Sequence, residues 1–299
     1  MKDRMLVISR NRNIGLSLIE LCSLLCVKLS SFHSWCKRIA KRQEVIKFTV
    51  EQESEVVKVF ELSRNTYGAR RVFEELKSSG RADISYQSVR RIMRKHGLKS
   101  VYCHRNGHRV ITTDSRQTKH IAENKLNRNF SAGKPNEKWC GDVTYIKTWE
   151  GFVFLATVID LFSRKLIGYA LSKHNNAELA CEAFKMALLR RRMPRELLFH
   201  SDRGASYGSD EFIKLLVSSR ITPSMSRKAE CLDNSVAECF NKILKVELVY
   251  RQIYRTMHDA VCAVQDWVEN FYNPKRLHSS LGYKSPDRFE LEHQKDVPF

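Results

Sequence analysis

Three acidic residues in the second half of the chain could act chemically together. Asp142 lies in an alternating stretch of β-branched and aromatic residues, Asp202 ends the apolar run LLFHSD, and Glu238 lies within DNSVAECFNKILK. Thirty-five residues separate Asp202 from Glu238. Carboxylates that converge without a cation repel one another and raise their own pKa values, so convergence of three is favoured when divalent cations bind them.

The oxygen ligands of such a site indicate its chemistry. Carboxylates suit Mg²⁺ or Mn²⁺, and two such ions ~3.5–4 Å apart activate an attacking oxygen and stabilise a leaving oxygen in phosphodiester displacement. We therefore predict that Asp142, Asp202 and Glu238 are catalytic residues that bind two Mg²⁺ or Mn²⁺ ions. Taken singly, Asp202 could be a turn cap, and Glu238 could form a surface pair with Lys242 worth ~0.3–0.5 kcal/mol.

Basic side chains accompany these acids. At helical spacing, Lys242 and Lys245 share one face with Glu238 and Asn241, whereas the apolar residues of this segment point elsewhere. Arg203 directly follows the second acid. Cations beside a carboxylate site suit a phosphate backbone, so Arg203, Lys242 and Lys245 are predicted to bind DNA. Arg203 could instead pair with a neighbouring acid.

The elements that position the acids are predicted between residues 136 and 250. Three β-rich segments, WCGDVTYIKT, GFVFLATVID and KLIGYALS, are joined by the short intervals TWEG and LFSR, which suit hairpin turns. Helical segments then alternate with two short strands, ELLFHSD and ITPSMS, and Asp233-Asn234 is predicted to cap the helix that carries Glu238. This order predicts an α/β fold with a five-stranded mixed sheet and flanking helices. In a ribonuclease-H-like sheet the first and fourth strands are neighbours, which would place Asp142 beside Asp202.

Charge is distributed unevenly along the chain. Residues 1–134 contain 28 Lys and Arg against 12 Asp and Glu, whereas residues 135–299 contain 24 against 21. A strongly basic front half indicates a polyanionic partner, and nucleic acid is the first candidate.

The basic half is predicted to be all-α, with helix-turn-helix patterns. Two short helices around a three-residue turn lie within residues 14–42, and further helices are predicted at 50–76 and 84–98. The basic side chains of the last helix are predicted to bind DNA: Arg90, Arg91, Arg94 and Lys95. The predicted organisation is a helical, helix-turn-helix-like segment at 1–48, a basic helix-turn-helix domain at 49–105, a basic linker at 106–135, the catalytic core at 136–250 and a helical extension at 251–299.

Several segments together resemble a known family. WCGDVTYI, VIDLFSRKLIGYAL, HSDRGASY, DNSVAECFNKILKVE and YNPKRLHSSLGYKSPDRF are similar to the signature segments of retroviral-integrase-like transposases of bacterial insertion sequences. The greatest similarity is to the second reading frame (OrfB) of the IS-three family. The basic segment from YGARRVFEELK to SYQSVRRIMRKHGLKS is also similar to that family, and the resemblance covers about residues 15–290.

The resemblance implies a fold, a reaction and partners. The fold is a ribonuclease-H-like core with a D-D-E triad, matched here by Asp142, Asp202 and Glu238. The reaction is Mg²⁺-dependent cleavage of transposon ends, giving a 3′-hydroxyl that attacks another DNA strand. The partners are transposon-end and target DNA, an upstream-frame OrfA protein or fusion, and further copies of the chain in a homo-multimer. The chain departs from the family pattern at Cys26, at Ala205-Ser206 and at Ala229-Glu230, positions that bear on loop conformation and DNA contacts.

Four residues outside the triad have competing interpretations. His200 is interpreted as packing beside the strand end, and Asp160 as the cap of the turn after the second strand. Arg276 and His278, in YNPKRLHSSLGY, either contact DNA or close the domain; the sequence does not separate these two readings.

No export signal or membrane-spanning segment is predicted. The most apolar early run, LSLIELCSLLCVKL, contains an acid and falls short of the ~20 residues that span a bilayer, so a cytoplasmic, nucleoid-associated bacterial protein is expected. A non-catalytic DNA-binding regulator or decayed copy is the main alternative function. A ribonuclease-H-type nuclease for RNA–DNA hybrids is a third, disfavoured by the basic N-terminal region.

Overall fold

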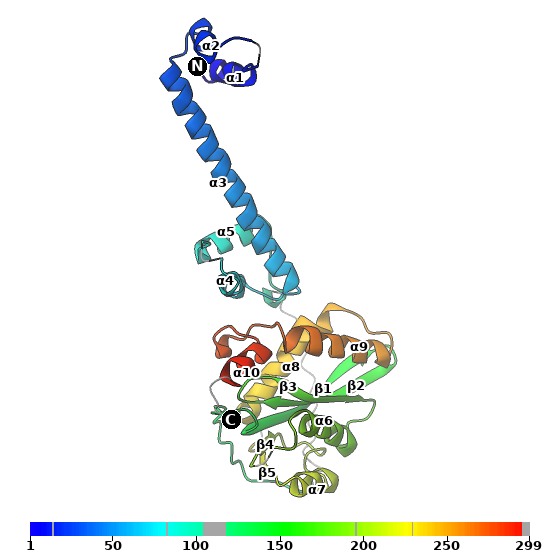
Figure 1. Ribbon diagram of the computed structural model, residues 1–299. Coiled ribbons are helices and arrows are strands. Elements are labelled where there is room, and N and C mark those ends of the chain that lie inside the picture. The colour runs from blue at the N-terminus through cyan, green and yellow to red at the C-terminus, as the bar shows by residue number, and fades with distance from the viewer. Residues whose placement is uncertain (14, 82, 104–117, 195, 229, 295–299) are drawn as a thin grey trace.

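The computed structural model describes residues 1–13, 15–81, 83–103, 118–194, 196–228 and 230–294 of the 299-residue chain. Figure 1 shows a small helical bundle, a long helix, a second bundle and a larger unit built on a sheet. The first bundle consists of α1 (Lys2–Arg10), α2 (Leu18–Leu24) and the first turns of α3 (Leu29–Leu62). It has a hydrophobic cluster of its own, which includes Ile8 and Phe32. Cys26, in the turn before α3, has a φ of 54°, a left-handed conformation that glycine adopts more readily than cysteine.

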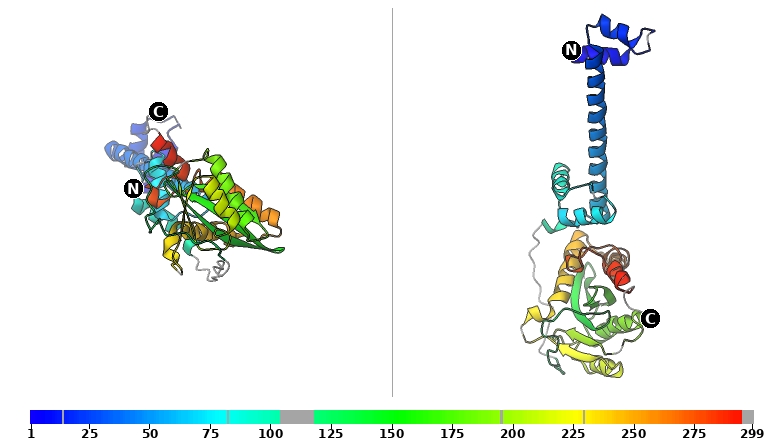
Figure 2. Two further views of the ribbon diagram at one scale, coloured as in Figure 1. Left: turned by 90° about the horizontal axis from the view of Figure 1, so that it is seen from below. Right: turned by 60° about the vertical axis from the view of Figure 1, so that its left-hand side comes forward.

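Helix α3 is longer than predicted. The sequence indicated one helix that ends near residue 42 and another that begins near residue 50, but the structure has one helix of 34 residues. No glycine or proline lies between those positions, so no residue there interrupts the backbone hydrogen bonds. The boundary predicted between residues 48 and 49 therefore lies inside a continuous helix, which Figure 2 shows as a straight rod.

The second bundle has the predicted helix-turn-helix pattern. The end of α3 packs against α4 (Ala69–Ser78) and α5 (Tyr86–Lys95), and a 3₁₀ turn, η1 (Val101–Cys103), follows. Ser85 caps α5, since its side chain accepts a hydrogen bond from the Ser88 amide. The apolar face of α5 is buried, so its basic side chains project into solvent.

The predicted fold class is confirmed by a five-stranded sheet in the order β3-β2-β1-β4-β5. The first three strands are antiparallel, and β4 and β5 are parallel to β1. The elements of this sheet unit are β1 (Lys138–Thr148), β2 (Gly151–Asp160), β3 (Leu166–Ser172), α6 (Ala177–Arg190), β4 (Leu198–Ser201), α7 (Asp210–Ser218), β5 (Thr222–Met225), η2 (Cys231–Asn234), α8 (Ser235–Glu247) and η3 (Val249–Arg251).

Helices cover both faces of the sheet, as Figure 1 shows. Trp139, Phe199 and their strand neighbours pack against α6 and α7 in one hydrophobic cluster. Residues of the opposite face, such as Cys140 and Ile159, pack with α8 and the C-terminal helices in another. This alternation follows from the two-residue repeat of a strand, and it decides which side chains face α8.

Asp160 caps the turn after β2, as predicted. Its Oδ2 accepts a hydrogen bond from the Asn136 amide at 3.0 Å, and its Oδ1 accepts one from the Phe162 amide at 3.0 Å. The side chain is completely buried, and burial raises its pKa to about 6.

The chain ends in a helical layer against the sheet. It contains α9 (Met257–Trp267), the π-helical turn η4 (Val268–Tyr272), the 3₁₀ turn η5 (Ser279–Leu281) and α10 (Pro286–Gln294). Trp267 and Tyr272 pack edge-on against Phe240 of α8. Within the described ranges, no helix is both long and apolar enough to cross a membrane.

Candidate active site

Asp142 lies in β1, and Asp202 directly follows the neighbouring strand β4. In the parallel pair β1 and β4, Cys140 lies opposite His200. Asp142 and Asp202 each follow their member of this pair by two residues. Because side chains alternate across a sheet, both acids lie on the face to which Cys140 belongs, which is the face covered by α8.

Asp142 is held by a residue of α8. The Asn241 Nδ2 donates a hydrogen bond of 2.7 Å to Asp142 Oδ2, and the Val143 amide donates one of 2.9 Å to Oδ1. Burial raises the pKa of Asp142 well above its usual range, and the negative charges of Asp202 and Glu238 raise it further. Asp142 is therefore within electrostatic reach of both other acids.

The sequence analysis predicts that Asn241 shares a helix face with Glu238, but it does not identify Asn241 as a site residue. Its position three residues after Glu238 was the available signal, since residues at i and i+3 share a helix face. Its contact with Asp142 could not be read locally, because the two residues come from different elements. Asn241 is 8% exposed, so the hydrogen bond lies in the interior.

Helix α8 is fastened to β1 at its first turn, and this corrects the predicted cap. Asn234 occupies the N-cap position but makes no capping hydrogen bond; its Nδ2 instead donates to Gly141 O at 3.0 Å. The buried Asp233 accepts hydrogen bonds from Arg227 and Arg128. The Arg227 guanidinium holds the pKa of this carboxyl well below its usual range. Glu238 projects from the next turn as an exposed side chain.

The loop after β4 shapes the surroundings of Asp202. The Gly204 amide donates a hydrogen bond of 2.9 Å to Asp202 Oδ1, and a Cβ at Gly204 would lie only 2.9 Å from the same oxygen. Tyr207 is 2% exposed, and among the described residues no group forms a hydrogen bond with its hydroxyl. Burial raises the Tyr207 pKa, and the charges of Asp142 and Asp202 raise it further. No sequence signal marked Tyr207 as a neighbour of the acids.

His200 is structural, as the sequence analysis favoured. It is completely buried, and its ring nitrogens lie 2.9 Å from Ser224 Oγ and 3.2 Å from Ser226 Oγ. Burial lowers its pKa to about 4. The imidazole therefore ties β4 to the end of β5.

The predicted cations near the acids differ in their exposure. Lys242 is exposed, whereas Lys245 is half-buried with its Nζ 4.5 Å from the centre of the Tyr145 ring. Burial lowers the pKa of Lys245. Arg203 is also half-buried, and its Nε donates a hydrogen bond of 2.7 Å to Ser226 O rather than to an acid.

The predicted DNA-binding side chains of α5 lie on its solvent face. Arg90, Arg91, Arg94 and Lys95 are all exposed. Lys95 forms an ion pair of 2.6 Å with Glu53 of α3, so part of its charge is neutralised inside the bundle.

Arg276 and His278 are interior residues, which supports the domain-closing reading. Arg276 is 1% exposed and His278 is 7% exposed. Arg276 Nη2 lies 2.7 Å from Glu247 Oε1 in a buried ion pair. Two of the residues that depart from the family pattern form polar contacts. Glu230 forms an ion pair of 2.6 Å with Arg128, and Ser206 donates a hydrogen bond to Asn175. Ala229 lies outside the described residues.

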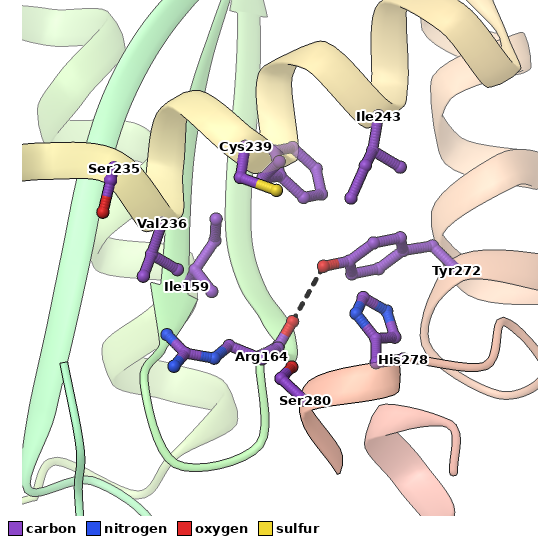
Figure 3. A pocket seen from close by; sticks show the side chains of 10 residues that line it. Ile159, Arg164, Ser235, Val236, Cys239, Ile243, Tyr272, His278 and Ser280 are labelled. Carbon is purple, nitrogen blue, oxygen red and sulfur yellow. Dashed lines mark hydrogen bonds between the residues drawn. The ribbon is translucent and has the colours of Figure 1, made fainter. Parts of the chain in front are cut away.

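A pocket of about 270 Å³ lies on another side of α8. Figure 3 shows Val236, Cys239 and Ile243 of α8 facing Tyr272, whose hydroxyl donates a hydrogen bond of 3.0 Å to Arg164 O. None of the three acids lines this pocket, so it is separate from the candidate active site.

No closed metal site is formed by the acids alone. Within the described part of the chain, no three His, Cys, Asp or Glu side chains converge closely enough to hold a metal ion. The acids are grouped electrostatically, but one of them, Glu238, remains at the surface.

Family models match both parts of the chain. A model described as an integrase core domain matches residues 132–231, a second with the same description matches residues 219–286, and an HTH-like domain matches residues 49–106. The fold and these matches define the protein's class: a polynucleotidyl transferase with an integrase core and a DNA-binding helix-turn-helix region.

The curated relatives identify the family. The transposase InsF for insertion sequence IS3A of Escherichia coli (strain K12) is 35% identical over 276 residues, which are 92% of this chain and 94% of that protein. The 31 kDa protein of insertion element IS600 of Shigella sonnei is 31% identical over 275 residues, 92% of this chain and 99% of that protein. The chain belongs to the IS-three (IS3) family of insertion-sequence transposases, as its sequence motifs indicated.

Solved structures provide more distant likenesses. The HTLV-2 integrase catalytic core domain in complex with magnesium is 20% identical with a TM-score of 0.41, and the match covers 53% of this chain and 99% of that chain. The simian T-cell lymphotropic virus intasome in complex with PP2A regulatory subunit B56 gamma is 16% identical with a TM-score of 0.45, covering 79% and 74%.

Proposed function

We propose that this transposase cuts transposon ends and joins the resulting 3′-hydroxyls to target DNA with Asp142, Asp202 and Glu238 as its catalytic acids. The observation that carries this proposal is the raised pKa of Asp142, whose causes after burial include the charges of both other acids. The placement of Asp142 on β1, Asp202 after the neighbouring β4 and Glu238 on the helix that contacts β1 supports a common site.

We also propose that these acids bind divalent cations, Mg²⁺ or Mn²⁺, with two ions in the complete site. The donor set fits, because it consists of carboxylate oxygens whose mutual repulsion a cation would relieve. Bound ions would activate the attacking oxygen and stabilise the leaving oxygen. Since Glu238 is exposed, its carboxylate is accessible to a cation and to DNA.

The protein's own residues hold the acids and the DNA. Asn241 orients Asp142 through its 2.7 Å hydrogen bond, and the Gly204 amide orients Asp202. Lys242 and Lys245, on the same helix as Glu238, are placed to pair with phosphates next to the cut, as is Arg203. Arg90, Arg91, Arg94 and Lys95 of α5 are proposed to hold the sequence near the transposon end.

Partners and location are further parts of the proposal. Joining requires two ends to be held together, so we propose a homo-multimer on DNA that acts with an upstream-frame OrfA protein or as its fusion. Its proposed place is the nucleoid of the bacterial cytoplasm. We further propose that residues 106–135 form a linker, that residues 136–250 form the catalytic core and that residues 251–299 form a helical extension.

A strand-transfer assay with the element's own ends and Mg²⁺ tests the triad. Asp142→Asn, Asp202→Asn and Glu238→Gln should each reduce end cleavage and joining by at least about 100-fold while the fold is retained. Glu292→Gln is the matched control, because Glu292 is a surface acid of α10 that is paired with Arg288. Joining by any triad variant at the wild-type rate would refute the assignment.

A Mn²⁺ titration followed by thermal unfolding tests the metal proposal. A cation at 100 times its Kd should stabilise the wild type by about 2.7 kcal/mol, and the Asp142→Asn variant should lose this effect. DNA binding without any metal response would instead favour a non-catalytic regulator.

A further inference from the structure

Residues 273–283, here called the RLH segment, lie beside the end of the catalytic helix α8. Arg276 donates hydrogen bonds to Glu247, the last residue of α8, with Nε 2.8 Å from Oε2 and Nη2 2.7 Å from Oε1. Both side chains are 1% exposed. His278 Nε2 lies 3.3 Å from Arg276 Nη1 on the other side of the guanidinium. The segment is therefore joined to the helix that carries Glu238.

Two tyrosines of the second bundle enter the RLH segment. The Tyr67 hydroxyl donates to Lys275 O at 3.0 Å and accepts from the Leu277 amide at 2.8 Å. The Tyr102 hydroxyl donates to Glu247 Oε1 at 2.6 Å. Hydrogen bonds are directional, so these contacts of the two hydroxyls fix how the second bundle is oriented against the RLH segment and α8.

Contacts around the tyrosines join the same two units. Arg64, at the end of α3, forms an ion pair of 2.8 Å with Asp266 of α9. Arg251, after α8, donates a hydrogen bond of 2.6 Å to Arg64 O. The guanidinium of Arg70 on α4 lies 5.7 Å from the centre of the Tyr283 ring, at the end of the RLH segment.

The hydrophobic clusters also join the second bundle to the sheet unit and leave the first bundle separate. The second bundle and the sheet unit share one continuous cluster, which contains Val89 of α5 as well as Phe240 of α8. The first bundle has a separate cluster at the far end of α3. Figure 2 shows the second bundle next to the end of α8 and the first bundle remote from it.

We propose that the RLH segment is a docking site for the second bundle, and that Tyr67 and Tyr102 are positioning residues that set where a bound transposon end is cut. If α5 grips the end sequence while α8 carries Glu238, the docking determines which phosphodiester reaches the acids. This inference rests on the proposed DNA contacts of α5 and on the proposed triad. It assigns to the RLH segment the choice of the cleaved bond, a role separate from DNA contact and from metal binding.

The test uses the full chain with its upstream-frame partner and a labelled duplex of the element's own end. In the double variant Tyr67→Phe/Tyr102→Phe only two hydroxyls are lost. Affinity for the end, measured by fluorescence anisotropy, should stay within about twofold of wild type. Cleavage in Mg²⁺, mapped on a sequencing gel, should spread to neighbouring phosphodiesters, with at least a threefold larger share of misplaced cuts, on the order expected for a small misplacement of reacting groups.

Hydrogen exchange provides a direct measurement of the docking. The Leu277 amide, which donates to the Tyr67 hydroxyl, should exchange at least about tenfold faster in the double variant. Tyr250→Phe is the matched control, because Tyr250 is a 46% exposed tyrosine of η3 that lies outside the RLH segment. It should change neither the exchange rate nor the cleavage position.

Two outcomes would overturn the proposal. One is a double variant that cuts only at the wild-type bond, and the other is a parallel loss of end affinity and helix content, which would mean that the tyrosines only maintain the fold. Failure of the proposed function looks different: a wrong triad leaves Asp142→Asn active, and a wrong DNA-binding face leaves Arg91→Ala/Arg94→Ala with full affinity.

Discussion

Replacement of Glu247 by Gln should destabilise the protein strongly, because it removes one half of a completely buried ion pair. Arg276 Nε lies 2.8 Å from Glu247 Oε2, Nη2 lies 2.7 Å from Oε1, and both side chains are 1% exposed. Burial alone would lower the pKa of Arg276, but the Glu247 carboxylate outweighs burial and raises it. An arginine guanidinium is not deprotonated in proteins, so Arg276 remains charged after the substitution and loses its counter-ion.

The expected loss follows from the cost of an unpaired buried charge, which is about 3–5 kcal/mol. For a unit of this size, each kcal/mol corresponds to roughly 2–4 °C, so the melting temperature should fall by about 6–20 °C. Differential scanning calorimetry at pH 7 measures this change. Glu247→Gln/Arg276→Met should recover much of it, because the double variant removes both charges and keeps an apolar side chain of similar length.

A surface pair provides the control. Arg288 Nε lies 3.0 Å from Glu292 Oε1, with side chains 50% and 38% exposed. Solvent screens such a pair, so Glu292→Gln should lower the melting temperature far less than Glu247→Gln does. The reasoning would be refuted if Glu247→Gln melted no lower than Glu292→Gln, or if the double variant were less stable than Glu247→Gln.

Three further predictions follow from the site, the DNA-binding face and the buried turn. Asn241→Ala should lower the rate of end cleavage by about tenfold or more while end affinity is kept, because Asp142 loses the 2.7 Å hydrogen bond that orients it; an unchanged single-turnover rate would contradict this. Arg91→Ala/Arg94→Ala should weaken DNA binding for all sequences and reduce the slope of log K against log salt by about two, one for each lost phosphate contact; the same slope as wild type would remove α5 from the interface. Burial raises the pKa of Asp160 to about 6, so the folded protein favours the protonated form of this side chain. The stabilisation that this provides is fully present below pH ~3.8 and is lost as pH rises through about 6. In urea titrations across that range, the free energy of unfolding of Asp160→Asn relative to wild type should therefore rise with pH by up to about 3 kcal/mol; a constant difference would show that Asp160 does not titrate there.

The sequence alone was sufficient for features with local or repeating signals. Alternation of apolar residues located β1, β2 and β3. The excess of Lys and Arg before residue 135 indicated a nucleic-acid partner. The spacing and types of Asp142, Asp202 and Glu238 suggested one site, because three acids have a reason to converge only around a cation.

Other features depended on residues far apart in the chain. The continuity of α3 could not be predicted, because the apolar residues between 42 and 50 stay exposed and give no buried face that marks a helix. The two ends of α3 pack in separate bundles. The role of Asn234 was mispredicted, since a local cap competes with a carbonyl on β1 that no sequence pattern reveals.

Arg276 is the clearest example of a residue whose role depends on the tertiary structure. Its sequence context, KRLHSS, is polar and basic and is equally compatible with a DNA contact and with a buried role. Only the tertiary structure places Glu247 against it and excludes solvent from both, so a side chain that appears available for phosphate is already paired. The sequence by itself determined the secondary structure of the sheet, the charge of the front half and the three candidate acids, because these follow from local spacing and composition. The tertiary structure decided which charges are exposed, which helix covers the acids and how the second bundle is docked, because burial and ion pairing depend on contacts between distant segments.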